Sequence, residues 1–108
     1  MAKLLLTGIG ASSGKAEGKA FIFTKDRLTS FKEGDILVAP ITDPTMVTAM
    51  IKAGAIVTDL GGITSHPAIL SREMGIPCVV NTKNATTKIK NGMCILVDGQ
   101  KGKIYAVD

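Results

Sequence analysis

Short apolar, often β-branched runs alternate with turn-forming residues along most of the chain. Runs of this kind, bounded by Gly, Asp, Asn and Pro, are typical of strands. The pattern predicts seven strands, near Leu4–Leu6, Ala20–Phe23, Ile36–Val38, Ala55–Val57, Cys78–Val80, Cys94–Val97 and Ile104–Val107. Asn91-Gly92 and Asp98-Gly99 predict tight turns on either side of the sixth strand, so the last two strands should form a hairpin.

Two stretches have helical spacing instead. In the first, Asp43 occupies the N-cap position, Pro44 the first helical position, and Gly54 a left-handed C-terminal cap. Its expected apolar face consists of Met46, Val47, Met50 and Ile51. The order of elements in the middle of the chain is therefore strand, helix, strand, helix, strand, with β structure on both flanks. This order predicts an α/β domain with a helical layer over a sheet and additional β structure on the other side.

The second helix is expected to begin near Ser65-His66-Pro67 and to end at Gly75. Pro67 suits the first turn, where a missing N–H leaves no hydrogen bond unmade. We expect Ile69 and Leu70 to lie on the buried face of this helix, where truncation to Ala would cost about 2–5 kcal/mol.

Length and charge narrow the functional classes. A chain of 108 residues suffices for one domain that folds without a disulfide or metal. Thirteen Lys and Arg against nine Asp and Glu give a net charge of +4, for which a solvated basic surface is the favoured interpretation. Binding to nucleic acid or another anion is an alternative that charge alone supports. Three Phe, one Tyr and no Trp argue against a stacking platform for single-stranded nucleic acid.

The cysteines and the N-terminus indicate a cytoplasmic protein. Cys78 and Cys94 lie in apolar runs, as expected of buried thiols in a reducing compartment. With one His in the chain they lack the spacing of a zinc site, so no metal is expected. The apolar run at the N-terminus is too short for a signal peptide or a membrane span.

The glycine-rich stretch Gly8–Lys15 does not fit a nucleotide-binding loop. A P-loop would need Gly where Ile9 stands and Ser or Thr where Ala16 stands. A dinucleotide-binding fingerprint would need Gly in place of Ser13. A flexible turn between strands is the favoured interpretation.

The segment from Thr58 to Pro67 is the strongest candidate for chemistry. It contains a Gly-Gly pair, which is followed by the two hydroxyl residues Thr64 and Ser65 and by the single His, His66, at the expected helix start. Helix N-termini present free N–H groups and partial positive charge, which favour anions. A ring nitrogen of His66 could accept a phosphoryl group, with Thr64, Ser65 and the helix N–H groups binding its oxygens. An acceptor on the other ring nitrogen would then fix the tautomer.

Simpler interpretations of these residues stay open. Ser65 or His66 could cap the helix while the glycines form a turn, leaving His66 as a polar surface residue. A Ser-His hydrolase is less favoured, because the two residues are sequence neighbours and no G-x-S-x-G elbow is present. Arg72 is not on the helix face of His66, so a surface salt bridge is its favoured role.

The stretch Gly61–Val80, GGITSHPAILSREMGIPCVV, resembles the signature of the phosphohistidine swivelling, or mobile, domain of PEP-utilising enzymes. These enzymes are phosphoenolpyruvate synthase, pyruvate phosphate dikinase and enzyme I of the sugar phosphotransferase system. Further matches lie at Gly8 to Gly18, Thr42-Asp43-Pro44, Ala55 to Asp59, Asp98-Gly99 and Gly102. Because the resemblance covers nearly the whole chain, we expect residues 1–108 to form a single mobile domain.

The resemblance implies a three-layer β/β/α fold and assigns site roles. His66 matches the phosphorylated histidine, and Gly61 and Gly62 match the turn that presents the loop. Thr64 matches a threonine that is a regulatory phosphorylation site in some dikinases, and Arg72 is a candidate supporting residue. One position departs from the family, which commonly has Gly after Val79-Val80. Asn81 stands there instead, and Asn tolerates left-handed backbone angles.

The resemblance also implies partners. In full-length enzymes the domain moves between an ATP-grasp nucleotide-binding domain and a PEP/pyruvate-binding barrel. Partner subunits of these two kinds are therefore implied, with Mg and ATP as their cofactors and none bound by this domain; neither nucleic acid nor a membrane is implied. Since 108 residues cannot hold both partner domains, the chain is not a complete enzyme alone. It is a separate small subunit, a free-standing phosphocarrier or a cut fragment, and Met1 favours a complete short protein.

The predicted function is that of a phosphoryl carrier in PEP/pyruvate-linked phosphotransfer, like that of phosphoenolpyruvate synthase. The alternative is a non-catalytic binding or regulatory module that retains the swivelling-domain fold. The retained Thr64-Ser65-His66 triplet argues against this alternative.

Overall fold

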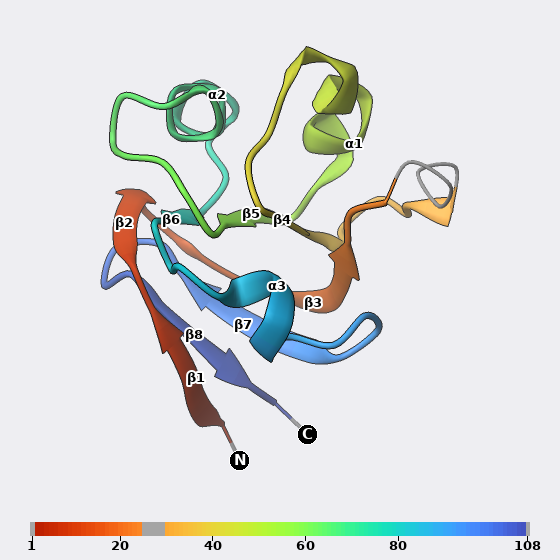
Figure 1. Cartoon of the computed structure of the whole chain (residues 1–108), viewed down its shortest axis with the longest axis vertical. Coiled ribbons are helices and arrows are strands. Elements are labelled where there is room, and N and C mark those ends of the chain that lie inside the picture. Colours follow the sequence, from red (N-terminus) through yellow and green to blue (C-terminus); the bar gives the residue numbers. More distant parts are fainter. Residues whose placement is uncertain (1, 25–29, 108) are drawn as a thin grey trace.

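The structure, a computed structural model, describes residues 2–24 and 30–107. The chain forms these elements in order: β1 (Lys3–Thr7), β2 (Ile9–Ser12), β3 (Lys15–Ile22), β4 (Ile36–Ala39), a 3₁₀ turn η2 (Pro44–Met46), α1 (Val47–Lys52), β5 (Ala55–Thr58), α2 (His66–Met74), β6 (Cys78–Val80), α3 (Ala85–Lys88), β7 (Cys94–Asp98) and β8 (Lys103–Ala106). Figure 1 shows their arrangement.

The strands form one sheet that folds over into two layers. Its order is β1-β8-β7-β3-β4-β5-β6-β2. β3 joins the layers, because Lys15–Lys19 pair antiparallel with β7 and Ala20–Ile22 pair parallel with β4. β1 and β2 are separated by Gly8 alone, yet β1 pairs with β8 and β2 pairs with β6. The chain therefore bends at Gly8. β1 and β2, which are the first and last strands of the sheet order, are consecutive in the sequence on either side of this bend.

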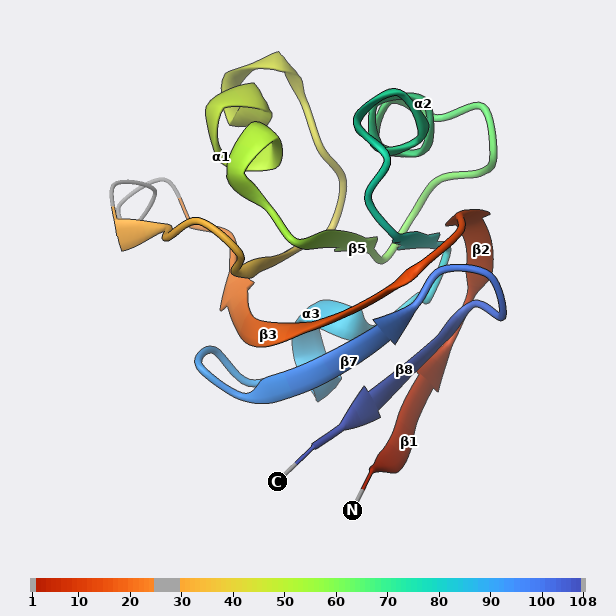
Figure 2. The same ribbon diagram turned by 180° about the vertical axis from the view of Figure 1, so that it is seen from behind.

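The parallel strands lie between the helices and the antiparallel layer. In Figures 1 and 2, α1 and α2 cover one side of β4, β5 and β6, while β1, β7 and β8 lie on the other side. Every residue of β4 and β5 is buried, as expected for strands that are covered on both faces. Leu37 and Ile56 pack toward the helices, whereas Ile36 and Val57 pack into the second core between the sheet layers. These layers confirm the α/β, three-layer β/β/α expectation.

Glycines allow the β7–β8 turn to cross β2 in close contact. A Cβ atom on Gly99 would lie 1.9 Å from the carbonyl oxygen of Ser12, and one on Gly10 would lie 2.3 Å from the carbonyl oxygen of Gly99. Side chains at these positions would force the backbones apart. The glycine-rich start of the chain is thus a strand crossing, and its interpretation as a flexible turn is wrong, because Ile9–Ser12 forms β2.

The predicted elements are largely confirmed. All seven predicted strands and both helices are present, and β3 starts earlier than expected, at Lys15. The prediction missed β2 and the short α3. The first helix begins as a 3₁₀ turn at Pro44, with Asp43 as its N-cap as predicted. Its predicted left-handed cap at Gly54 is wrong, because the helix ends at Lys52 and Ala53 continues in extended backbone.

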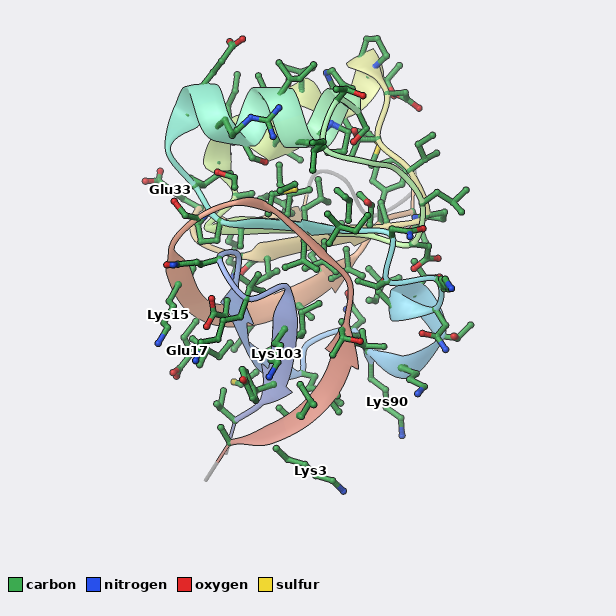
Figure 3. The ribbon with its side chains drawn as sticks, turned by 90° about the vertical axis from the view of Figure 1, so that its left-hand side faces the viewer. Lys3, Lys15, Glu17, Glu33, Lys90 and Lys103 are labelled. Atoms are coloured by element: carbon green, nitrogen blue, oxygen red, sulfur yellow. The ribbon has the colours of Figure 1, made fainter. Side chains whose placement is uncertain are left out.

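Charged side chains gather on the antiparallel layer. Figure 3 shows Lys3, Lys15, Glu17, Lys90 and Lys103 on the side of the molecule away from α2. Lys3 pairs with Ala106, so the two ends of the described chain lie side by side on that layer as well. In the ranges 2–24 and 30–107, no helix is long and apolar enough to cross a membrane.

Candidate active site

The candidate site lies where β4 and β5 end. These strands are parallel neighbours, so the segments that follow them emerge at the same edge of the sheet. The backbone continues the pairing there, because Asp59 N–H donates to the Ala39 carbonyl oxygen and Leu60 N–H donates to that of Pro40, both at 3.1 Å. The loop that leads to α2, hereafter the His loop (residues 60–65), therefore starts beside the segment after β4.

His66 is the first residue of α2 and is exposed. Its Nδ1 atom is hydrogen-bonded to Oγ1 of Thr42 at 2.9 Å. Thr42 follows β4 and is 5% exposed, so its hydroxyl is held in a fixed place by the surrounding structure. An imidazole has two ring nitrogens, and Nε2 is the one that does not take part in this contact. The Thr42 hydroxyl thus occupies the position of the acceptor that we expected on the other ring nitrogen.

The sequence prediction left this acceptor unidentified. Thr42 had been noted for its match to the family, but without a role. A signal was present, because the segment after β4, which contains Thr42, emerges at the same sheet edge as the loop after the neighbouring parallel strand β5.

Ser65 closes the His loop on itself. Its hydroxyl donates to the Gly62 carbonyl oxygen at 2.6 Å, and its N–H donates to the same oxygen at 3.0 Å. Gly61 has φ +119°, and a Cβ atom there would lie 3.0 Å from Oγ of Ser65. Gly61 is thus required by its backbone, whereas a Cβ on Gly62 would meet no atom of the described residues within 4 Å. Thr64 is exposed.

The alternative that a Ser65 or His66 side chain caps α2 is wrong. Ser65 occupies the N-cap position of α2 with extended backbone angles, but neither its hydroxyl nor another side chain caps the helix. The Ile69 N–H is bonded to the Ser65 carbonyl oxygen, and Pro67 has no N–H. Ala68 is fully buried, so the amide of His66 is the one that the first turn can offer to an anion.

Arg72 ties the His loop to the sheet. Its Nη1 donates to the Ala11 carbonyl oxygen of β2 at 2.7 Å, and its Nη2 donates to the Ile63 carbonyl oxygen at 2.6 Å. The favoured expectation of a surface salt bridge is therefore wrong. A guanidinium suits this task, because its planar fork can serve two acceptors at once.

The segment after β6 supports the start of the His loop. Thr82 donates to the Thr58 carbonyl oxygen through its N–H and, at 3.0 Å, through its hydroxyl. The Asp59 carboxylate is buried and accepts from the N–H and the hydroxyl of Thr86. Asn81 has φ 56°, which confirms that asparagine can adopt the left-handed turn at this position. Lys83 is also left-handed, with φ 75°.

The helix α2 covers a buried cysteine of β6. Its buried residues are Pro67, Ala68 and Ser71. Burial raises the pKa of the Cys78 thiol to about 11, an effect that the neighbouring Ser71 hydroxyl and the Arg72 cation partly offset. The expectation that Ile69 is buried is wrong, since 44% of its surface is exposed, and Leu70 is half-buried.

Comparison with known proteins decides the family. The sequence profile of "PEP-utilising enzyme, mobile domain" matches residues 31–102, a range that includes Thr42, the His loop and α2. The chain belongs to this family. The mobile domain is 55% identical over 105 residues to "Phosphoenolpyruvate synthase" of Pyrococcus furiosus, a match that covers 96% of the chain and 13% of that protein. It spans 12–15% of the length of eight similar synthases, so relatives of this domain are much larger proteins.

Solved structures agree with the family and the fold. A solution structure of Enzyme I matches with a TM-score of 0.61 and 33% identity, covering 71% of the mobile domain and 32% of that chain. Aconitase X of Thermococcus kodakaraensis matches with a TM-score of 0.71 over 95% of the mobile domain and 98% of that chain. At 21% identity, the second likeness concerns the fold alone.

Proposed function

We propose that the mobile domain carries a phosphoryl group on Nε2 of His66 between a donor and an acceptor in phosphoenolpyruvate synthase-type phosphotransfer. Two observations support this proposal. Nδ1 of His66 lies 2.9 Å from Oγ1 of Thr42, and His66 is exposed at the start of α2. When Nδ1 holds its proton and donates it to Thr42, Nε2 keeps its lone pair and is the nucleophile.

The transfer needs no proton relay within the domain. The Nε2 lone pair attacks phosphorus, and the N–P bond forms as the bond between phosphorus and the donor oxygen breaks. With PEP as the donor, the leaving oxygen keeps the electron pair, and the enolpyruvate takes a proton from solvent to become pyruvate. The Nδ1 proton stays on the ring, where its bond to Thr42 stabilises the positive charge of the phosphorylated imidazole.

The loop and the helix start would hold the phosphoryl oxygens. The amide of His66 lies at the positive end of α2, and the exposed Thr64 lies two residues before the nucleophile. The Ser65 hydroxyl already donates to Gly62, so it acts first by shaping the loop. We assign Gly61 and Gly62 to the turn that presents this loop and Arg72 to its attachment to β2.

Thr64 is the proposed regulatory position. A phosphate on its hydroxyl would place a dianion beside His66 and repel an incoming phosphoryl group. The exposure of Thr64 makes it accessible to a modifying enzyme.

We propose that the nucleotide-binding and substrate-binding parts of the enzyme lie outside these 108 residues. The domain spans 13% of the Pyrococcus furiosus synthase, and we propose an ATP-grasp nucleotide-binding part, using ATP and Mg, and a PEP/pyruvate-binding barrel as its partners. We place this reaction in the cytoplasm, where the free thiols of Cys78 and Cys94 would stay reduced. The chain alone should form no PEP from ATP, Mg and pyruvate.

The test is phosphorylation in trans. The chain is mixed with Pyrococcus furiosus phosphoenolpyruvate synthase, Mg and radiolabelled PEP, and label in the small chain is followed on a gel. We expect a label that is acid-labile and base-stable, as a P–N bond is, and that disappears in His66→Ala. An acid-stable label, or equal labelling of His66→Ala, would contradict the proposal, and absence of any label would favour a non-catalytic module with the same fold.

A further inference from the structure

A surface depression of about 410 Å³, hereafter the β2 depression, lies where β2, the β7–β8 turn and the C-terminal part of α2 meet. In Figure 2 the β7–β8 turn lies beside β2, and Gly10 and Gly99 allow the close crossing of these two segments. The volume of the depression is in the range of sites for small molecules, about 300–1,000 Å³. Of the described residues, neither His66 nor any residue of the His loop lines it, so it is separate from the candidate active site.

Ser12, in β2, brings a hydroxyl without a protein partner to this depression. Ser12 is 7% exposed, and its hydroxyl makes no hydrogen bond with another described residue. Among the described side chains, the oxygen that is both unpartnered and closed off from solvent is Oγ of Ser71, so the Ser12 hydroxyl opens into the depression that Ser12 lines. A hydroxyl on a side chain that is nine-tenths buried is normally satisfied by a hydrogen bond, which a ligand in the depression would supply.

Arg72 brings a positive charge in a fixed place to the same depression. Its Nη1 and Nη2 donate to the carbonyl oxygens of Ala11 and Ile63, at 2.7 and 2.6 Å, which holds the guanidinium against the peptide bond that joins Ala11 to Ser12. Both partners are neutral carbonyl groups, so neither neutralises the charge. A guanidinium has five N–H donors, of which these two bonds use two. Because Arg72 is already held in place, a ligand would bind it with little further loss of side-chain entropy.

The other polar side chains that line the β2 depression also suit an anion. Ser13 and Gln100 are exposed there and bring a hydroxyl and an amide. Of the described residues that line it, Arg72 alone is charged, so no carboxylate of the lining would repel an anion. Arginine binds carboxylate and phosphate groups through two parallel hydrogen bonds, which are stronger than bonds between neutral groups. The lining therefore indicates a ligand with an oxyanion.

We propose that the β2 depression binds the oxyanion end of a small organic acid or phosphate monoester. Arg72 and the Ser12 hydroxyl donate to the carboxylate or phosphate oxygens, and Ser13 and Gln100 bond to the polar body of the ligand. A bare inorganic ion would fill little of a depression of about 410 Å³, so the ligand is an organic molecule of metabolite size. Binding at this site does not require phosphorylation of His66 and is independent of the proposed function.

Three probes with the same three-carbon skeleton test the site. Glycerol 3-phosphate carries a phosphate, glycerate carries a carboxylate, and glycerol carries neither. Each is titrated into the ¹⁵N-labelled chain, and the backbone amide signals are followed by two-dimensional nuclear magnetic resonance. For at least one of the two acids we expect saturable shifts at Ser12, Ser13 and Gln100 with a Kd of about 1 mM or below, the range of metabolite sites, and no saturation with glycerol. The acid that binds more tightly shows whether the site takes a phosphate or a carboxylate.

Matched variants separate this site from a general effect of charge. Ser12→Ala removes the unpartnered hydroxyl without changing the charge, and it should weaken binding about tenfold, as expected for the loss of a hydrogen bond to a charged group. Arg72→Gln removes one positive charge from the depression and should weaken binding at least as much. Lys19→Gln is the control, because Lys19 is also an exposed cation but lies at the end of β3 that pairs with Cys94, whereas the β7–β8 turn follows Asp98 at the other end. This control should bind the acid with the wild-type affinity.

Wild-type affinity in Ser12→Ala would overturn the proposal, even if Arg72→Gln failed to fold. Equal weakening by Lys19→Gln and Arg72→Gln would also overturn it, because the acid would then respond to the overall charge of the chain. Saturable binding of glycerol, or failure of both acids to saturate the wild type, would contradict it as well.

Discussion

Replacing Thr42 by Val tests the role of the ring contact. Valine has nearly the shape of threonine but lacks the hydroxyl that lies 2.9 Å from Nδ1 of His66. Thr42 is 5% exposed, so the new methyl group fills the space of the hydroxyl, and the exposed imidazole can bond to water instead. The free energy of unfolding should therefore change by no more than about 1 kcal/mol.

The effect on phosphorylation should be larger, because the ring becomes cationic as the N–P bond forms. A hydrogen bond to a charged group contributes about 1.5–3 kcal/mol, against about 1 kcal/mol for a neutral one. The variant loses both the extra strength of the charged hydrogen bond and the fixed tautomer. The activation barrier for phosphorylation should therefore rise by about 1–2 kcal/mol, which corresponds to a phosphorylation rate about 5- to 30-fold lower. This loss of rate should appear with a small chemical phosphoryl donor as well as with a partner protein, because the contact lies within the domain.

The assay uses phosphoramidate, a small phosphoryl donor, and mass spectrometry under alkaline conditions measures how fast the chain becomes phosphorylated. Thr42→Ser is the matched control, because it keeps the hydroxyl and should react within about threefold of the wild type. A wild-type rate for Thr42→Val, or an equally slow Thr42→Ser, would refute the assignment of Thr42 as the residue that orients the ring.

Three further outcomes are expected, each measured by denaturant melts. Ile69→Ala should lower the free energy of unfolding by less than about 1 kcal/mol and Leu70→Ala by about 1–2 kcal/mol, since one is exposed and the other half-buried; the reverse order would contradict the described packing of α2. Arg72→Met should cost about 1–3 kcal/mol, because two backbone carbonyl groups lose a charged donor, and a neutral effect would show that the loop is held otherwise. Burial raises the pKa of the Cys78 thiol from 9.0 to about 11, so the thiol loses its proton at a lower pH in the unfolded chain than in the folded chain. The free energy of unfolding should therefore fall as the pH rises from 9 to 11. Cys78→Ala should make this fall less steep, and an unchanged slope would contradict the prediction.

The fold was predictable where burial on both faces leaves a continuous apolar run. β4 and β5 show this clearly, because all their residues are apolar or small and the turns beside them are marked by Gly, Asp and Pro. β2 was missed because its sequence, IGAS, has one large apolar residue. Its Gly10 serves the close crossing by the β7–β8 turn, which pairs distant parts of the chain and leaves no local pattern.

The candidate site could be located from the sequence by its histidine, but the residues that support the loop could not. The Gly-Gly pair, the hydroxyl residues and His66 are contiguous, so local reasoning could combine them. Thr42 follows β4 and Ala11 lies in β2, so their contacts with His66 and Arg72 exist only once the sheet has formed. Ile69 was wrongly placed in the core because helical spacing alone does not distinguish an apolar residue that packs inward from one that is exposed.

Nuclear magnetic resonance of the phosphorylated chain tests the central claim most directly. The chain is labelled with ¹⁵N in its single histidine, His66, and phosphorylated by Pyrococcus furiosus phosphoenolpyruvate synthase with PEP. The account predicts a ³¹P–¹⁵N coupling to Nε2 while Nδ1 keeps its proton. Phosphorus on Nδ1, or on the hydroxyl of Thr64 or Ser65 with an unmodified ring, would contradict it.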